Sequence, residues 1–390
     1  MHKTISSALC VALIGVSTIG PAASADAIDG ATPPKAPSYP NIEIEGSAEL
    51  QAQTIRPQDP DGRINEAFAT IEPEITLNVS EQFSLVAHLL YEPVEDADPG
   101  TTEWFAHQGL YAEELYARVT LGNLVIGGGK LDPVFGLASD LAPGVYGSDI
   151  AESYDYKGAL GGRVQWQFAA TQAAATGGDV TRTQSLDVSV FSADTTFLSR
   201  SLFTDRGELS IDDGGVGNSG RPDSFALAYN VRTVNGDDEI VGPAGQLALR
   251  RLAKGADEGH DEWGLLGSGM DVLEVTDGVT LTALAEAAYF VHQAGGDADA
   301  ASGTLGAELR EGPWIESVTA AAVRTFGDEA VTDGLITASL GRDLDLGGAH
   351  PLRVDAAYAR SETDGVKANT FGLRLHQDFS WSSVDTSSAE

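Results

Sequence analysis

The sequence alternates apolar residues with polar or small ones over runs of about ten to thirteen residues, from Asn41 to Trp381. A break of Gly, Asp, Asn or Pro follows each run. Because successive side chains of a strand point to opposite faces, this spacing predicts strands with one apolar face. After residue 25, no stretch approaches the roughly 18 apolar residues of a membrane-spanning helix. The chain is therefore expected to be all-β.

The last strand shows the alternation most clearly. One face carries Phe371, Leu373, Leu375, Phe379 and Trp381, and the other carries Thr370, Gly372, Arg374, His376 and Asp378. Aromatic residues often close the apolar face at a strand end, as a membrane-interface girdle requires. The alternation is weakest over 262–275 and 314–326. In all, the pattern predicts about sixteen strands, at 42–53, 66–79, 82–92, 110–121, 123–132, 159–171, 183–193, 222–234, 244–254, 262–275, 278–292, 301–311, 314–326, 332–344, 350–361 and 367–381.

The connections between these strands differ in length by parity. They are tight after the second, fourth, tenth, twelfth and fourteenth strands, and about 17, 26 and 28 residues long after the third, fifth and seventh. Short turns at one end and long loops at the other are typical of a transmembrane antiparallel up-and-down β-barrel, with the turns in the periplasm. Lipid forces such a barrel to close, and sixteen strands enclose an aqueous channel. A large soluble β-sandwich or β-helix also alternates, but would not normally sort its connections this way.

The N-terminus reads as an export signal. A basic start, an apolar run and the small residues before Ala25 predict a signal peptide at 1–25, cleaved after Ala25. The single cysteine, Cys10, lies inside it, so the mature chain needs no disulfide. A linker at 26–40, a barrel at 41–381 and a tail at 382–390 complete the expected organisation. This organisation indicates the outer membrane, with its lipid and lipopolysaccharide as partners.

The formal net charge of −35 excludes nucleic acid as a partner, because phosphate backbones require Lys and Arg. Two interpretations of the acidity stay open. The acids keep surface loops soluble, or they set up a field that attracts cations or divalent ions. No cofactor, metal site or catalytic residue is expected.

One segment resembles a known family. The stretch Gly129 to Gly136 reads Gly-Lys-Leu-Asp-Pro-Val-Phe-Gly. It is similar to the Gly-Lys-hydrophobic-x-Pro-x-Phe-Gly signature of the phosphate-selective porin O and P group. Pro133-Val134-Phe135-Gly136 also resembles the Pro-x-Phe-Gly element of general Gram-negative porins. The close resemblance covers roughly residues 110–150.

The resemblance implies that the loop after the fifth strand folds into the barrel and narrows it. It also allows a homotrimer. The chain departs from the pattern of these porins in two ways. This chain has few of the lysines and arginines that anion-selective porins place in the pore, and Ser382 to Glu390 follow the final aromatic residue. The expected constriction loop contains Asp132, Pro133, Phe135, Gly136, Asp140, Asp149, Glu152 and Asp155.

Charges on this loop and on the barrel wall predict a transverse field in the lumen. Asp140, Asp149, Glu152 and Asp155 would supply carboxylates opposite bases on the wall. Such a field filters solutes by size, charge and dipole. The alternative is that these charges simply pair in a solvated wall. The residues expected on the wall are Arg118, Lys130, Arg163, Glu114, Arg353 and Arg374.

Two further segments are acidic. Residues 257–262 form a dense acidic loop with one histidine, His260, and residues 212–218 resemble an incomplete calcium loop. Both are interpreted chiefly as solvated loops, with ion binding as the alternative. The function expected overall is passive diffusion of small hydrophilic solutes and ions through a cation-preferring pore. The alternatives are an anion- or phosphate-selective porin, an outer-membrane lipase or protease using the His260 loop, and a plugged structural or adhesive barrel.

Overall fold

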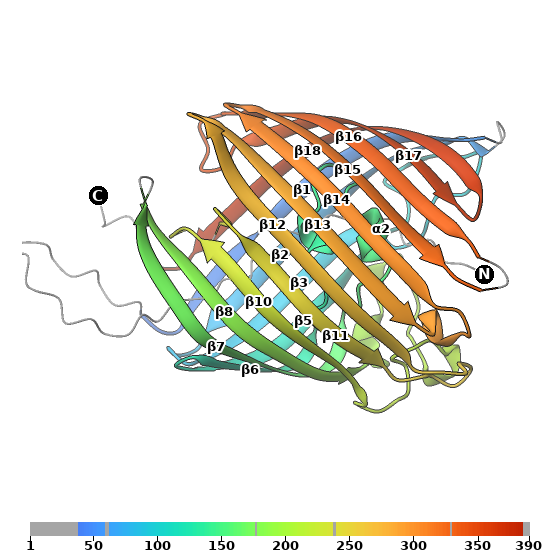
Figure 1. Cartoon of the computed structure of the whole chain (residues 1–390), viewed down its shortest axis with the longest axis horizontal. Helices are drawn as coiled ribbons and strands as arrows, with labels where there is room; N and C mark the ends of the chain where they lie inside the picture. The colour runs from blue at the N-terminus through green and yellow to red at the C-terminus, as the bar shows by residue number, and fades with distance from the viewer. Residues whose placement is uncertain (1–37, 59–61, 176–177, 237–238, 328–329, 385–390) are drawn as a thin grey trace, which may run out of the picture.

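The computed structural model describes residues 38–58, 62–175, 178–236, 239–327 and 330–384. Sixteen strands form one antiparallel barrel, and two short strands in the loops bring the sheet to eighteen strands (Figure 1). The barrel strands are β1 (Asn41–Pro57), β2 (Ile64–Asn78), β3 (Phe83–Pro93), β5 (Gln108–Leu121), β6 (Leu124–Leu131), β7 (Ala159–Ala175), β8 (Gly178–Ser192), β10 (Ser224–Val234), β11 (Ala244–Leu252), β12 (Glu262–Thr276), β13 (Val279–Val291), β14 (Ala300–Glu311), β15 (Trp314–Thr325), β16 (Thr332–Leu344), β17 (Leu352–Thr363) and β18 (Val366–Ser382).

The ring closes between the first and last strands. β1 pairs with β18 from Glu43↔Ser382 to Pro57↔Ala368, and each other barrel strand pairs with its neighbours along the chain. The additions β4 (Thr102–Trp104) and β9 (Leu202–Phe203) lie within long loops. All sixteen expected strands are therefore confirmed. β7 and β8 reach closer to their shared turn than expected, and Figure 1 shows this hairpin projecting beyond its neighbours.

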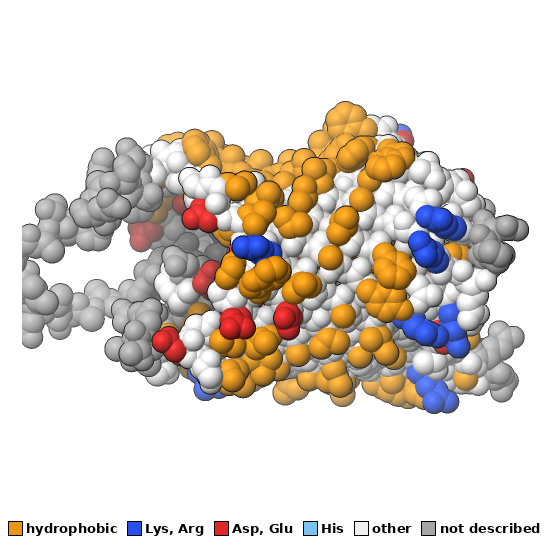
Figure 2. Space-filling view, turned by 90° about the horizontal axis from the view of Figure 1, so that it is seen from above, with side chains coloured by type: hydrophobic (Ala, Val, Ile, Leu, Met, Phe, Trp, Pro, Cys, Tyr) orange, Lys and Arg blue, Asp and Glu red, His pale blue; other side chains and the backbone are white. Residues whose placement is uncertain are grey.

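The two faces of the strands differ as the alternation predicted. In β18, Leu373 is 63% exposed on the outer face while its neighbour Arg374 is 5% exposed on the inner face. β15 also alternates strictly between exposed and buried positions, although its sequence pattern is weak. The pattern is weak because small residues such as Ala320 and Ala322 occupy its outer face. Figure 2 shows hydrophobic side chains spread across the middle of the outer face.

The connections follow the predicted parity. The turns 122–123, 277–278 and 312–313 lie at one end, and the loops 94–107, 132–158 and 193–223 lie at the other. We call these the turn end and the loop end of the barrel. The loops also contain α1 (Ala138–Leu141), α2 (Asp149–Glu152), η2 (Phe197–Ser199), η3 (Ile211–Asp213) and η4 (Gln293–Gly295).

The termini of the barrel lie at the turn end. β18 extends one residue past the expected boundary at Trp381, and the amide of Ser383 still donates to the carbonyl of Ile42 at 2.9 Å. The expected signal peptide lies outside the described residues, as do 385–390 of the expected tail. Within the described residues, none of the helices has the length and apolar character needed to cross a bilayer.

Candidate functional site: the loop inside the barrel

The loop between β6 and β7, residues 132–158, crosses the interior of the barrel. It contains α1 and α2, and Figure 1 shows α2 behind the front strands, where it contacts β14 and β15. The loop is the segment that the sequence predicted to fold inward. We call it the lumen loop.

Carboxylates hold together the two ends of the lumen loop, which we call its neck. The backbone amide of Asp132 donates to Glu114 Oε1 at 2.9 Å, and the amide of Gly158 donates to Asp132 Oδ1. Burial raises the pKa of Asp132 well above its usual range, and the charges of Glu113 and Glu114 raise it further. Asp132 and Glu114 therefore hold the two ends of the loop together.

The first half of the lumen loop is anchored to β13. Glu286 accepts from the amide of Leu137 at 2.7 Å, from the amide of Ala138 at 3.2 Å and from the Tyr154 hydroxyl at 2.6 Å. Gly136 has a φ of +113°, a conformation that side-chain-bearing residues rarely adopt, and its amide donates to Gln246 of β11. The glycine of the Pro-x-Phe-Gly element is thus required for this turn against the wall.

An aromatic cluster holds the same half of the loop. Phe135 is 4% exposed, and its ring lies 6.1 Å from that of Phe290 on β13, which also contacts Tyr154 at 5.4 Å. The guanidinium of Arg250 lies 4.3 Å from the centre of the Phe135 ring and donates to the Tyr154 carbonyl at 2.7 Å. The phenylalanine of the motif is therefore an anchor of the lumen loop.

The middle of the lumen loop contacts three further strands: β15, β16 and β1. Thr319 of β15 donates to the Pro143 carbonyl at 2.7 Å, and the Tyr146 hydroxyl donates to Gln53 of β1 at 2.8 Å. Val145 and Tyr146 pack with Leu335. The loop therefore spans the lumen from β6 to β11, β13, β15 and β1.

Three of the loop acids have raised pKa values, and the charge of Lys157 opposes each shift. Burial raises the pKa of Asp140 to about 7, and Lys157 opposes this rise while Asp155 and Glu113 add to it. Burial also raises the pKa of Asp155 and of Glu152, and Lys157 opposes both shifts. Lys157 itself lies 3.8 Å from Glu113 of β5. Lys157 therefore joins the end of the lumen loop to β5.

Asp149, the fourth expected loop acid, begins α2 and raises the pKa of Glu152 by its charge. The remaining motif residue, Pro133, is buried beside the neck of the loop. The structure thus brings all four expected loop acids inside the barrel.

The structure corrects the role expected for two wall bases. Lys130 is only 2% exposed, lies 3.0 Å from Asp194 and donates to the Leu198 carbonyl at 2.9 Å. Arg163 lies 2.7 Å from Asp187. Both charges are neutralised by acids on neighbouring segments, so they do not form a basic wall opposite the loop acids. The expected alternative, local pairing of wall charges, describes these residues.

Two more expected wall bases, near the closure, are also paired. Arg353 donates to Asp343 at 3.0 Å. Arg374 lies between Glu49 at 3.1 Å and Asp355 at 3.0 Å. Arg118 lies on the inner face of β5, paired in register with Ser84 of β3.

Sequence reasoning missed three residues that define the site. Lys157 is the base among the loop acids, Glu286 is the main anchor, and Arg250 joins the loop to Glu262 at 2.8 Å. Glu286 stands on the polar face of an alternating strand, which made it a candidate for the lumen. Its contact with a loop about 150 residues away left no signal in the sequence.

The acidic loops at the loop end use their carboxylates internally. Asp261 lies 2.7 Å from Arg251, and Glu258 accepts from the amide of Gly215 at 2.6 Å. The side-chain amide of Asn218 donates to the carbonyls of Ser210 and Gly214. Within the described residues, no group of three or more His, Cys, Asp or Glu side chains is arranged to hold a metal ion.

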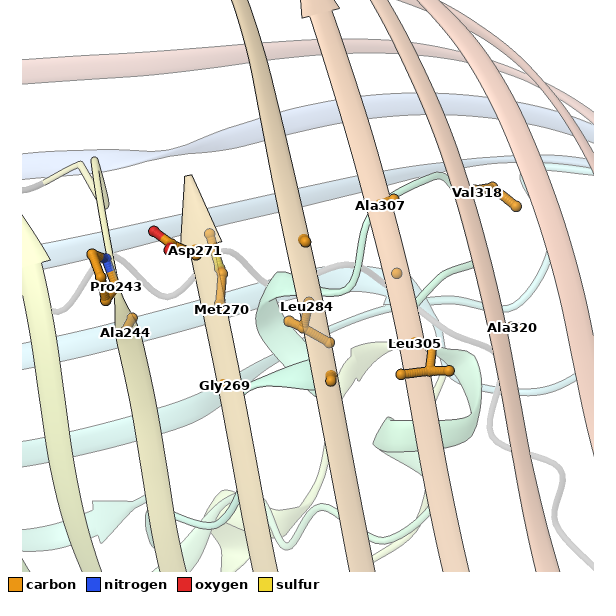
Figure 3. A pocket seen from close by; sticks show the side chains of 13 residues that line it. Pro243, Ala244, Gly269, Met270, Asp271, Leu284, Leu305, Ala307, Val318 and Ala320 are labelled. Atoms are coloured by element: carbon orange, nitrogen blue, oxygen red, sulfur yellow. The ribbon is translucent and has the colours of Figure 1, made fainter. Parts of the chain in front are cut away.

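A hollow of about 660 Å³ lies along β11–β15 (Figure 3). Its lining is almost entirely small or apolar, with Met270, Leu284, Leu305 and Val318 as the larger side chains and Asp271 as the charged one. It offers few groups that would orient a hydrophilic solute. The lumen loop is therefore the better candidate for a functional site.

Comparisons with known proteins support the fold. No protein-family model and no curated protein matches the sequence. The structure is similar to the outer membrane channel DcaP of Acinetobacter baumannii, with a TM-score of 0.50 and 12% identity over 87% of this chain and 97% of that chain. It is also similar to OpdK of Pseudomonas aeruginosa, solved with vanillate, with a TM-score of 0.50 and 10% identity over 87% and 99%. The expected likeness to outer-membrane channels is thus confirmed at the level of the fold.

Proposed function

We propose that the protein is an outer-membrane porin through which small hydrophilic solutes and ions diffuse passively, with a preference for cations. The observation that carries this proposal is the lumen loop, which contains Asp140, Asp149, Glu152 and Asp155 and ends with Lys157 3.8 Å from Glu113 of β5. A narrow zone with carboxylates on both sides concentrates cations and repels anions.

The pairing of the wall bases supports the same sign of selectivity. Lys130, Arg163 and Arg374 each lie within about 3 Å of a carboxylate, so their charges are largely cancelled. An anion- or phosphate-selective pore would instead need bases exposed to the solute. Homotrimer formation stays a prediction from the resemblance to porins.

The zero-current potential in a potassium chloride gradient tests the proposal. The wild-type channel is expected to favour potassium, and increasingly so at low salt, because the Debye length is about 10 Å at 0.1 M. Neutralising the four loop acids should move the potential towards chloride. The test variant combines Asp140→Asn, Asp149→Asn, Glu152→Gln and Asp155→Asn.

A matched control removes the same charge from exposed positions on turns and outer loops, where solvent screens it. This control should leave the potential nearly unchanged. An anion-selective wild type would contradict the proposal, and equal shifts in both variants would contradict the role of the lumen loop. The control combines Glu81→Gln, Asp212→Asn, Asp277→Asn and Asp345→Asn, all of them exposed.

The enzyme alternative has two candidate pairs. His260 lies 3.1 Å from Asp297 and stacks on His292 with ring centres 4.1 Å apart, at the loop end. His350 lies 3.0 Å from the hydroxyl of Ser380 at the turn end. The carboxylate beside His260 is 99% exposed, which leaves it fully hydrated and a weak partner for catalysis. Stepwise conductance of the purified protein without hydrolytic activity would separate the pore from the enzyme and from a plugged barrel.

A further inference from the structure

Basic side chains gather on the outer face of the barrel at the loop end. Figure 2 shows Lys and Arg side chains beyond the hydrophobic region at the end where, in Figure 1, the arrows of β13 and β15 finish. Arg56 and Arg360 are exposed and Lys367 is partly exposed, and each shares the strand face of outward apolar residues. The chain has only 23 Lys and Arg against 58 Asp and Glu, so a cluster of bases on a lipid-facing surface requires an explanation.

The register of the strands brings these bases together around Asn369. On β18, Asn369 is paired with Arg360 of β17 on one side and with Arg56 of β1 on the other. Neighbouring strands lie about 4.8 Å apart, so the two arginines stand roughly 10 Å apart across one strand. Lys367 lies two residues along the same face of β18. We call Arg56, Arg360, Lys367 and Asn369 the rim cluster.

The rim cluster lies directly above an aromatic pair. Tyr358 and Phe371 have ring centres 5.1 Å apart, and the Tyr358 hydroxyl donates to Asn369 at 2.7 Å. The guanidinium of Arg56 lies 5.6 Å from the centre of the Phe371 ring. Aromatic side chains on the outside of a barrel mark the boundary between acyl chains and headgroups. The bases therefore lie at headgroup depth.

Among the described residues, the acids near the rim cluster do not cancel its charge. Glu362 lies 3.5 Å from Lys367, an exposed pair that stabilises weakly. Asp364 lies in the following turn, where its amide donates to Asp333. Arg56 contacts only an aromatic ring in the described interactions, which leaves its five N–H donors available at this surface.

We propose that the rim cluster binds the phosphate group of a glycolipid in the outer leaflet. Arginine guanidinium groups recognise phosphate with two parallel hydrogen bonds, and basic residues just outside a membrane span are attracted to anionic headgroups. Two arginines flanking an amide offer such contacts, while the outer face below supplies Phe371 and Leu373 for the acyl chains. The inference rests on the proposed outer-membrane placement, with the loop end outward, and does not depend on ion selectivity.

Native mass spectrometry of the refolded barrel tests the proposal, with bisphosphorylated lipid A as the probe. The variant Arg56→Gln/Arg360→Gln/Lys367→Gln should bind it about a hundredfold more weakly than the wild type, since each base near an anionic surface contributes about 1 kcal/mol. Dephosphorylated lipid A should bind wild type and variant alike. The matched control is Arg342→Gln, an exposed arginine 4.9 Å from the Trp314 ring at the turn end, and it should bind as the wild type does.

Each result decides for or against the rim cluster. Equal binding of phosphorylated and dephosphorylated lipid A would overturn the proposal, as would an equal loss in Arg342→Gln. Inorganic phosphate binding as tightly as lipid A would overturn the lipid as occupant. Heat-modifiable gel migration shows whether the triple variant folds. Should it not fold, Arg56→Lys/Arg360→Lys keeps the charge without the paired N–H geometry and is expected to bind about tenfold more weakly than the wild type. Wild-type binding by this variant would then contradict arginine-specific recognition of the phosphate.

Discussion

The wall formed by β1, β2, β3 and β5 differs from the wall formed by β14, β15 and β16 in the chemistry of its inward side chains. The first, which we call the acid wall, includes Glu49, Glu72, Glu74, Glu92, Glu113 and Glu114. The second, the hydroxyl wall, includes Ser302, Thr304, Ser317, Thr319 and Thr337.

The difference explains how the lumen loop is oriented. Covering a hydroxyl removes a neutral group from water, whereas covering a carboxylate without a partner costs much more. The tip of the loop accordingly lies against the hydroxyl wall, where Thr319 donates to the Pro143 carbonyl. Lys157, near the other end of the loop, lies 3.8 Å from Glu113 on the acid wall. The hydroxyl wall therefore holds the loop, and the acid wall sets the charge of the passage.

The largest loss of stability is expected from a substitution on β18, beside the acid wall. Replacing Arg374 with Leu leaves Asp355 buried without its base and leaves Glu49 with His376 alone, at 2.8 Å, which should cost about 3–5 kcal/mol. The measurement is urea unfolding of the barrel in lipid vesicles. Arg342→Leu, an outward and exposed position, is the control and should change stability by less than about 1 kcal/mol. Equal effects would show that water in the lumen hydrates Glu49 and Asp355 and that the acid wall needs no internal bases.

The next effect concerns the anchor between the two walls. Glu286→Ala removes the acceptor of two backbone amides and the Tyr154 hydroxyl, and each unsatisfied donor costs roughly 1–3 kcal/mol. The lumen loop should detach, so that single-channel conductance rises and protease cleaves within 132–158. Glu308→Ala, on β14 beside Arg310, removes a carboxylate from the lumen without touching the loop and should do neither. An unchanged conductance in Glu286→Ala would mean that the aromatic cluster alone holds the loop.

A smaller effect is expected when the pH changes the potassium preference of the channel. Because the pKa of Asp140 is raised to about 7, lowering the pH through that value protonates it and removes a negative charge facing the acid wall. Potassium preference should therefore fall between about pH 8.5 and 5.5. One charge about 4 Å from a passing ion is worth about 1 kcal/mol in water, which limits the change in permeability ratio to roughly fivefold. Asp140→Asn should flatten the profile near pH 7, and a variant that keeps the full pH step would assign the titration to another group.

Much of the fold was predictable because lipid and water impose local rules. Alternation places Leu373 outward and Arg374 inward within one strand, and turn lengths sort by parity along the chain. Small side chains blurred the pattern in β15 without changing its structure. These features depend on residues close in sequence, so a single chain reveals them.

The partners of the lumen charges were not predictable in the same way. Lys130 was expected to face the passage, but Asp194 in the loop 193–223 neutralises it. Glu286 holds a loop about 150 residues earlier in the chain. Such contacts depend on the course of a long loop inside the closed barrel. Neither the composition nor the periodicity of the sequence predicts that course.

The smallest effect compares two threonines that face each other on the hydroxyl wall. Thr319 of β15 and Thr337 of β16 are paired in register and are both almost fully buried. Thr319 donates to the Pro143 carbonyl at 2.7 Å, whereas the hydroxyl of Thr337 has no hydrogen-bond partner among the described residues. Thr319→Val should therefore cost about 0.5–1.5 kcal/mol, while Thr337→Val should be neutral or slightly stabilising. Urea unfolding of both variants measures the difference. If both variants lost the same unfolding free energy, the hydrogen bond from Thr319 to Pro143 would not stabilise the barrel measurably. The loop tip would then be held by the polar surface of the wall as a whole.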